Sequence, residues 1–271
     1  MMRTSLRAAE QGFTLLEIMK LWHWVALGIG AYFAFALSSF PAGTAYAWFA
    51  PAGLQLDGLE GTLWSGRAAA GNVGNLSLRD VRWSVHAWQL LLGRVAADLR
   101  AQLDEGYVAA HVKATRGHVS LSEVRASTSL STLRPVLPIS GLRGQANLTL
   151  SALELDVAKA WPTKVVGNLK LLQLETTPLN LTGPRGKLFP IGNYDVLLSE
   201  GPGPINAKFN DTGGPLEVSG TLAVNAARAY FLDGLIKPRA DAAQELVDGL
   251  NVIASDPDAE GRRRLMINGS L

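Results

Sequence analysis

The chain has 271 residues, with 25 Lys and Arg, 23 Asp and Glu, four His and no Cys. Hydrophobic residues make up 48% and charged residues 18%, which excludes a disordered chain, because such chains bury too little apolar surface to offset the entropy of folding. The lack of Cys excludes a disulfide framework and a Cys-based zinc site, and a net charge of +2 argues against a nucleic-acid partner, whose phosphates require clustered cations.

An uncharged apolar run lies near the amino terminus. Residues 21–40 read LWHWVALGIGAYFAFALSSF, and a helix of this length spans roughly 30 Å, the hydrocarbon thickness of a bilayer. Basic residues precede the run and none follows it before Arg67, a bias that places the amino terminus in the cytoplasm. The sequence therefore predicts a cytoplasmic leader over residues 1–20 and a transmembrane anchor over residues 21–40, with the remainder outside the cytoplasm.

Alternatives for the processing of this amino terminus stay open. The small residues of 45–47 fit a signal peptidase site, although the apolar run is longer than a usual signal core. The stretch Gly12-Phe13-Thr-Leu-Leu-Glu17 resembles the processing motif of type IV prepilins and pseudopilins, in which the bond after Gly12 would be cut and Glu17 would stand fifth in the mature chain. Translation from Met19 would instead give an ordinary anchor start.

The rest of the chain has the patterns of strands. Residues 41–58 are rich in Ala, Gly and Pro and predict a linker, which leaves residues 59–271 as a β-domain. Apolar and polar residues alternate over 95–103 and again over 108–115, and Asp104-Glu105-Gly106 between them indicates a hairpin. Alternation with one polar face predicts an antiparallel sheet that is covered on one side only.

A short pattern with a central Gly recurs in this β-domain: an apolar residue, any residue, Gly, any residue, and then Leu or Ala. Because Gly within a strand marks a bulge, a bend or a close backbone approach, repeated bends would curl the sheet into a groove or gutter. The central glycines are Gly61, Gly144, Gly167, Gly220 and Gly269. Helical patterns are few, a short one over 84–92 and an amphipathic one over 238–254.

No catalytic, cofactor or metal site is predicted. Asp211-Thr212-Gly213 spells the triplet of aspartic proteases, but that chemistry needs two carboxylates that share a proton, and the sequence has no second copy. His111 and His118 lie seven positions apart without a compact carboxylate cluster, which favours a solvated pair over a metal site. The expectation is a protein that is not an enzyme.

Residues 61–68 read Gly-Thr-Leu-Trp-Ser-Gly-Arg-Ala and follow the apolar run closely. This stretch resembles the signature of the type II secretion system protein N family. Its signature residues here are Gly61, Thr62, Leu63, Trp64, Gly66 and Arg67. Stretches at 211–222 and 237–241 resemble later pieces of the family pattern, and the resemblance covers nearly everything from about Met19 to Leu271.

Four side chains are candidate partner contacts, namely Trp64 and Arg67 of the signature and Arg262 and Arg263 near the carboxyl end. The alternative for Trp64 is a side chain that caps the core at a bulge, and for Arg67 one that satisfies a nearby carboxylate or carbonyl. The arginines of 262–264 could attract anionic headgroups or an acidic partner, or could form a solvated turn.

The resemblance implies a mainly β fold, in which an amino-terminal transmembrane helix precedes a curved antiparallel sheet, an AsmA-like groove or half-barrel with a few short helices. It implies a non-enzymatic accessory component of the inner membrane that supports export of folded proteins across the outer membrane by tethering and assembly contacts in the periplasm. The implied partners are the inner-membrane platform, the secretin and membrane lipid, with no cofactor. A lipid-binding or lipid-transfer groove is the alternative function, and a divergent pseudopilin is a third.

Overall fold

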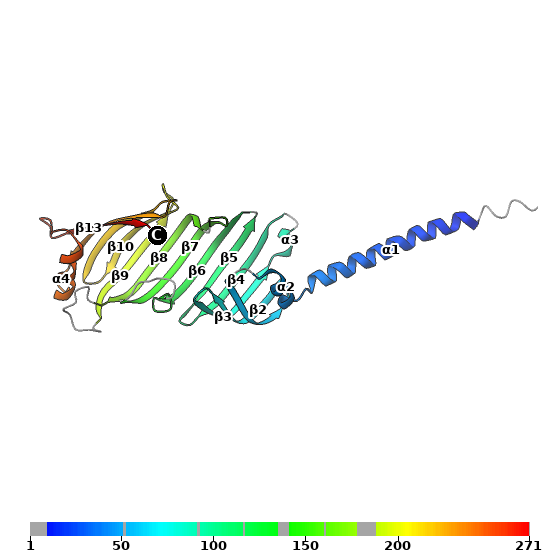
Figure 1. Ribbon diagram of the computed structural model, residues 1–271, viewed down its shortest axis with the longest axis horizontal. Helices are drawn as coiled ribbons and strands as arrows, with labels where there is room; N and C mark the ends of the chain where they lie inside the picture. Colours follow the sequence, from blue (N-terminus) through cyan, green and yellow to red (C-terminus); the bar gives the residue numbers. More distant parts are fainter. Residues whose placement is uncertain are drawn as a thin grey trace, which may run out of the picture.

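The computed structural model describes residues 10–50, 53–90, 93–115, 117–134, 141–159, 161–177 and 188–270, and of residues 10–21, 49 and 253 only the backbone. Thirteen strands form one sheet, and their order in the sheet is their order along the chain. Every neighbouring pair is antiparallel, so the sheet is a meander (Figure 1).

The strands alternate in direction across the sheet, and most are joined by short turns. Their bounds are β1 Leu54–Gly61, β2 Ser65–Val73, β3 Leu76–Val85, β4 Val95–Leu103, β5 Gly106–Thr115, β6 His118–Ser129, β7 Leu142–Asp156, β8 Trp161–Thr176, β9 Phe189–Ser199, β10 Ile205–Gly213, β11 Leu216–Val224, β12 Ala229–Pro238 and β13 Arg263–Ser270. Because sequential strands pair throughout, the register of each pair depends on the turn that joins its two strands and on any bulge within them.

The two faces of the sheet differ in polarity, as the alternating patterns predict. One row of directly paired residues, the apolar row, crosses the sheet from β4 to β13: Ala101, Val108, Ala126, Leu148, Leu169, Val196, Phe209, Gly220, Gly234 and Leu265. The adjacent polar row points to the other face: Arg100, Ala109, Arg125, Thr149, Asn168, Leu197, Lys208, Thr221, Asp233 and Met266. Among the described residues no helix lies across the apolar row (Figure 1).

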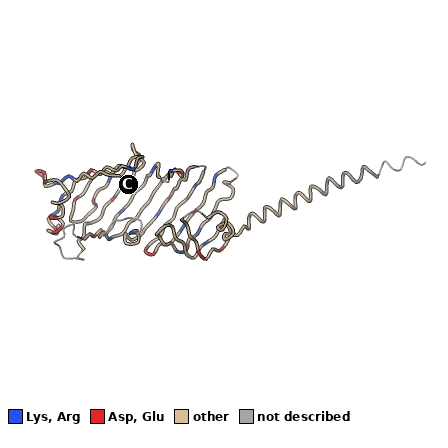
Figure 2. The backbone as a smooth tube through the Cα atoms, viewed as in Figure 1, with Lys and Arg blue, Asp and Glu red and all other residues tan. Residues whose placement is uncertain are grey.

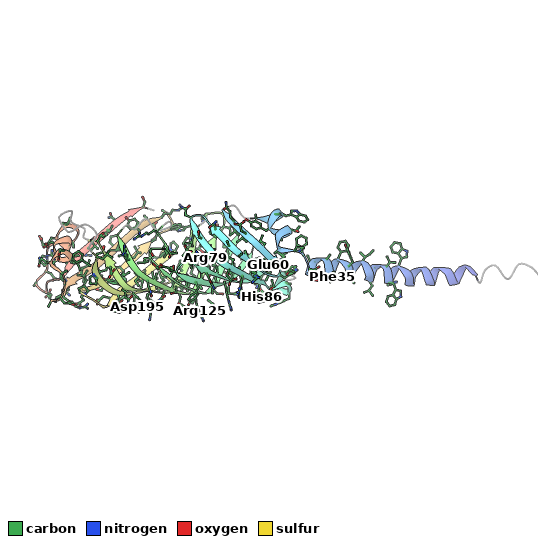
Figure 3. All side chains as sticks on the ribbon, turned by 90° about the horizontal axis from the view of Figure 1, so that it is seen from below. Phe35, Glu60, Arg79, His86, Arg125 and Asp195 are labelled. Atoms are coloured by element: carbon green, nitrogen blue, oxygen red, sulfur yellow. The ribbon has the colours of Figure 1, made fainter. Side chains whose placement is uncertain are left out.

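Bulges bend the strands. The register of β7 against β8 shifts at Gly144, whose φ is 141°, and the register of β8 against β9 shifts beside Gln173, whose φ is 51°. A Cβ at Gly144 would lie 2.8 Å from the Leu172 carbonyl oxygen, so only glycine fits this bend. The predicted mainly β fold with a curved antiparallel sheet is therefore confirmed (Figures 1 and 3).

Another glycine of the recurring pattern, Gly220, does not bend its strand but lets neighbouring atoms approach its backbone closely. Gly220 pairs in regular register with Phe209 and Gly234. A Cβ at Gly220 would lie 2.5 Å from Phe209 Cζ and 2.7 Å from Gly234 Cα. The missing side chain therefore lets the Phe209 ring lie over β11, which adds apolar cover where the sheet has no second layer.

The tightest packing lies beside helix α4 (Gln244–Ile253), at the end of the sheet remote from the amino terminus (Figure 1). Leu216, Ile236 and Leu250 form its buried cluster, each with 8% exposure or less. The helix that the amphipathic pattern predicts over 238–254 is therefore present. It begins later than expected, at Gln244, because the first residues of the range complete β12 and form a turn.

Two local predictions about shorter segments had different outcomes. Leu103 pairs with Gly106, which leaves Asp104 and Glu105 as the turn between β4 and β5, so the predicted hairpin is confirmed. The helix expected over 84–92 is wrong at its start, because Val85 still pairs in the sheet and helix α3 covers only Ala87–Leu90.

Two helices precede the sheet, α1 (Glu10–Ser38) and α2 (Ala42–Phe49). Most described side chains of α1 are exposed, and Phe35 is 71% exposed (Figure 3). Within the part of the chain that the structure describes, no helix, including α1 over the range expected as an anchor, is long and apolar enough to cross a membrane. Helix α2 and the start of β1 occupy the range 41–58 that the sequence indicated as a linker.

Candidate functional site at the junction of helix and sheet

The signature residues form the turn between β1 and β2. Thr62 N donates to the Ser65 carbonyl oxygen (2.9 Å), and Ser65 N donates to Thr62 Oγ1 (3.2 Å). Gly61 has φ 89°, and a Cβ there would lie 2.6 Å from the Ser65 oxygen, so the turn requires glycine at this position. The signature residues therefore have a structural role, because they form and stabilise this turn.

The same turn bonds to the end of α1. Trp64 Nε1 donates to the Leu37 carbonyl oxygen (2.6 Å), and Leu63 N donates to the Phe40 carbonyl oxygen (2.9 Å). Pro41 and Thr62 form a further β-bridge. The last carbonyls of a helix lack i+4 partners within it, and the Leu37 oxygen accepts from both Phe40 N (3.3 Å) and Trp64 Nε1. The turn thus fastens the helix to the sheet.

Trp83 of β3 holds this turn from the other side. Its Nε1 lies 3.3 Å from the Thr62 carbonyl oxygen and 3.2 Å from that of Leu63. A Cβ at Gly66 would lie 2.5 Å from Trp83 Cζ2, so the indole packs directly against the glycine backbone. In the sequence Trp83 ends the stretch Val81-Arg-Trp83, which resembles a further piece of the family pattern, but that resemblance predicts no role for it at this turn.

Arg67 forms an ion pair with Glu60, its direct partner across β1 and β2. Both Arg67 Nε and Nη2 donate to Glu60 Oε2, at 2.9 and 2.8 Å. Both side chains are more than half exposed, so the pair contributes little to stability. The expectation that Arg67 satisfies a nearby carboxylate is confirmed, whereas a partner contact through Trp64 or Arg67 stays a prediction.

Helix α2 packs beside β1 and completes the junction. The Tyr46 hydroxyl donates to the Leu54 carbonyl oxygen (2.8 Å) and accepts from Leu56 N (3.1 Å). An apolar cavity of about 310 Å³ lies between α2, β1 and β3. It is lined by Ala42, Ala45, Tyr46, Ala50, Leu56, Leu59, Leu63 and Trp83. The small side chains of α2 leave this space open.

The carboxy-terminal arginines lie far from this junction, and carboxylates hold the first of them. Arg262 pairs with Asp258 and Glu260, each at 3.0 Å, and the hydrogen bond to Asp258 raises the pKa of the Arg262 guanidinium. Arg263 Nη1 donates to the Ser255 carbonyl oxygen (3.2 Å). The structure does not bring these arginines together with Trp64 and Arg67, and their contact with a partner stays a prediction.

The protease-like triplet has a structural role in the described residues. Asp211 Oδ1 accepts from Val218 N (3.0 Å), and its Oδ2 lies 2.7 Å from Arg239 Nη2. The nearby Tyr194 hydroxyl donates to the Ile191 carbonyl oxygen (2.6 Å), and burial, with Asp211 adding to it, raises the pKa of Tyr194 to about 12. Strand β10 continues through the triplet, and the turn to β11 follows at Gly214 and Pro215.

The structure pairs His111 with a different histidine from the one the sequence suggested. His111 Nδ1 lies 2.7 Å from Asp98 Oδ1, and His86 Nε2 lies 3.6 Å from Asp98 Oδ2, with the two rings 5.8 Å apart. His118 stands apart at the β5–β6 turn. Across the described residues, no group of three or more His, Asp or Glu could hold a metal ion.

The prepilin-like residues Gly12, Phe13 and Glu17 lie within α1. Their side chains belong to the part of the chain of which only the backbone is described. Processing after Gly12 therefore stays a prediction.

A helix tied by hydrogen bonds to one end of a single-layer meander defines a β-sheet protein with an attached amino-terminal helix. The sequence profile described as type II secretion system (T2SS), protein N, matches residues 52–266, and the chain belongs to that family. A Type II secretion system protein N from Aeromonas hydrophila is 27% identical over 252 residues, which are 91% of this chain and 97% of that protein. One from Vibrio cholerae serotype O1 is 50% identical over 50 residues, 18% of this chain and 20% of that protein. No solved structure matches the chain.

Proposed function

We propose that the chain is a non-enzymatic accessory component of the type II secretion system, which supports the export of folded proteins by tethering. Helix α1 attaches it to the bacterial inner membrane, and the sheet extends into the periplasm to meet other components. Membership of the protein N family supports the accessory role. The junction carries the tethering, because Trp64 bonds to Leu37 at the end of α1 and Leu63 bonds to Phe40 just after it, so a load on the sheet is transmitted to the helix.

Membrane attachment rests on the apolar run over residues 21–40. The described side chains of α1 include Trp22 and Trp24, each 70% exposed, and Phe33, 66% exposed. Figure 2 shows this part of the helix without charged residues, whereas basic and acidic residues are scattered over the sheet. Exposed apolar surface of this extent favours a lipid environment over water. The basic residues ahead of the run favour a cytoplasmic amino terminus and a periplasmic sheet.

The partners in this proposal are the inner-membrane platform and the secretin, which lie on the two sides of the periplasm that the sheet would extend into. Charges on the sheet are mixed in sign, as Figure 2 shows, so the shape of the sheet is better suited than a single charged patch to recognise these partners.

Removal of the sheet tests this proposal. A strain that makes residues 1–50 but lacks 51–271 should secrete less of a folded substrate than a strain with the full chain, measured as enzyme activity in the culture medium against activity in the cells. Immunoblots of the other components should show unchanged amounts. Full secretion from the truncated strain contradicts the proposed role.

A lipid-binding or lipid-transfer groove is a second candidate, and one specific observation favours it. The apolar row crosses ten strands, and its larger members are only partly buried. An apolar face without a second layer could hold acyl chains.

Lipid carried by the purified chain tests this second candidate. The full chain, washed free of bulk lipid, should retain phospholipid at a fixed molar ratio in mass spectra. A variant with Leu148→Asp and Leu169→Asp on the apolar row should lose it, whereas Thr149→Asp and Asn168→Asp on the polar row should retain it. A chain without bound lipid, or equal loss in both variants, contradicts a groove.

A further inference from the structure

The meander has two edge strands, β1 and β13, and they differ in how far other parts of the chain cover them. At β1 the Tyr46 hydroxyl bonds both Leu54 O and Leu56 N, and α2 covers the strand. At the opposite end of the sheet, remote from α1, β13 has no such cover over most of its length (Figure 1). An edge strand with unpaired backbone groups is a template for another strand.

The open part of β13 begins after Arg264. Ser255 N donates to the Arg264 carbonyl oxygen (3.0 Å), and Arg264 N donates to Ser255 Oγ (2.8 Å). The backbone N–H and C=O groups of Arg264 therefore point away from β12. Because backbone groups alternate in direction along an antiparallel strand, the N–H and C=O groups of Met266, Asn268 and Ser270 point the same way. Among the described residues these three make no backbone hydrogen bond outside the sheet.

Nothing in the side chains of this stretch discourages pairing. Residues 265–270 read Leu-Met-Ile-Asn-Gly-Ser, without a charge or a Pro, and they pair with β12 without a register shift. Met266 is 56% exposed and Ile267 42%, on opposite faces, and Phe231 of β12, opposite Asn268, is 43% exposed. Edges of natural sheets usually carry a charge, a Pro or a bulge that prevents such association.

We propose that β13 pairs antiparallel with β13 of a second copy of this chain, about a two-fold axis at Asn268. This axis places Asn268 opposite Asn268 of the second copy and Met266 opposite Ser270, so the three outward residues of each copy form hydrogen-bonded pairs. The pairing ends where Ser255 covers Arg264, and Arg264 keeps its bonds to Asp233, at 2.9 and 2.7 Å. No like charges therefore face each other across the interface.

The chain lacks Cys, so one introduced Cys tests the pairing without background. Hydrogen-bonded residues of an antiparallel pair have Cα atoms about 5.5 Å apart, within the range of a disulfide. Full-length Asn268→Cys, oxidised at low concentration in mild detergent, should run at twice 28.9 kDa without reductant. The matched variant Thr221→Cys, exposed on the polar row of β11, should stay monomeric. Equal cross-linking of both variants, or of neither, overturns the proposal.

A charge at the axis provides a second test that leaves the fold intact. Asn268→Lys places two ammonium groups opposite each other, so the detergent-corrected mass should fall by half, whereas Thr221→Lys should keep the dimer. Asn268 is exposed, so the far-ultraviolet circular dichroism of the sheet should stay that of the wild type. A wild-type chain that is monomeric contradicts the proposal, and so does an Asn268→Lys dimer. The result is independent of the secretion assay, because the cross-link needs no other component.

Discussion

At the scale of single residues, the junction of helix and sheet depends on a glycine, Gly66, and on a hydrogen-bond donor, the indole N–H of Trp64. Gly66 lies under the Trp83 ring, and Trp64 donates to the Leu37 carbonyl oxygen at the end of α1. Both residues belong to the signature of the family. Their contacts are internal to the chain, which gives the signature a structural role independent of any partner.

Gly66→Ala should destabilise the sheet by about 1–3 kcal/mol, because the new Cβ would lie 2.5 Å from Trp83 Cζ2 and 2.6 Å from the Glu60 carbonyl oxygen. Gly43→Ala in α2 is the matched control, since a Cβ there meets no atom within 4 Å and Ala is the better helix residue. Denaturant unfolding followed by tryptophan fluorescence measures both. Equal stability of the two variants would show that the Trp83 ring moves without cost.

Tyr194 should make stability depend on alkaline pH. Its pKa is raised to about 12 by burial and by Asp211, above its ordinary value, so the folded state favours the protonated phenol. The stabilisation is full below about pH 10 and is lost as the pH rises through about 12. Between about pH 9 and about pH 12 the wild type should lose more stability than Tyr194→Phe, measured as melting temperature at each pH. Parallel losses in the two proteins would contradict this assignment.

At the scale of elements, the sheet and α1 meet through the β1–β2 turn, and the turn is held by β3. The helix end, the turn and the neighbouring strand therefore form one hydrogen-bonded unit, through Leu37, Trp64 and Trp83. A connection of this kind restricts the direction in which the helix leaves the sheet. It is the feature of the fold that a tether requires.

Trp64→Phe should loosen this unit while keeping the aromatic ring. Loss of one net hydrogen bond of about 1 kcal/mol should raise amide exchange at Ser39 and Phe40 by about fivefold, measured by hydrogen–deuterium exchange of the full chain. Trp88→Phe is the control, because Trp88 is 60% exposed on α3. Unchanged exchange in Trp64→Phe would mean that the helix end is held by the Leu63 amide alone.

How far the sequence predicts these elements depends on the range of the contacts. The sequence predicts a hairpin at Asp104-Glu105-Gly106, and in the structure Asp104 and Glu105 form a two-residue turn that fixes the pairing of Asp98 with His111. His86 joins them only through the β3–β4 connection, whose register shifts beside Asp80, and no local pattern reports that shift.

The predicted site shows the same limit. The Arg67–Glu60 pair follows from a local hairpin, and the expectation of a carboxylate partner was therefore correct. The Trp64 bond to Leu37 joins residues 27 positions apart through a change of chain direction that alternation does not encode. Trp83 contributes from a third strand, so its role emerges only once β2 and β3 are paired.

At the scale of the whole molecule, the chain is a single-layer sheet with a polar face, an open apolar face and an attached helix at one end (Figure 1). A single-layer sheet exposes more surface than a globular domain of the same mass. It offers partners the apolar face, the turns at both ends of the strands and the open edge at β13. We propose that helix and sheet act together, because a tether works only when the membrane-attached part and the periplasmic part are one chain.

A split chain tests this central claim most directly. One strain makes the full chain, and another makes residues 1–50 together with residues 51–271 exported separately behind a cleavable signal, with equal amounts of sheet in the periplasm. Secretion of a folded substrate into the medium should be restored by the full chain and not by the two pieces, because the separated sheet is no longer held at the membrane. Full secretion from the two pieces would contradict tethering as the role of this protein.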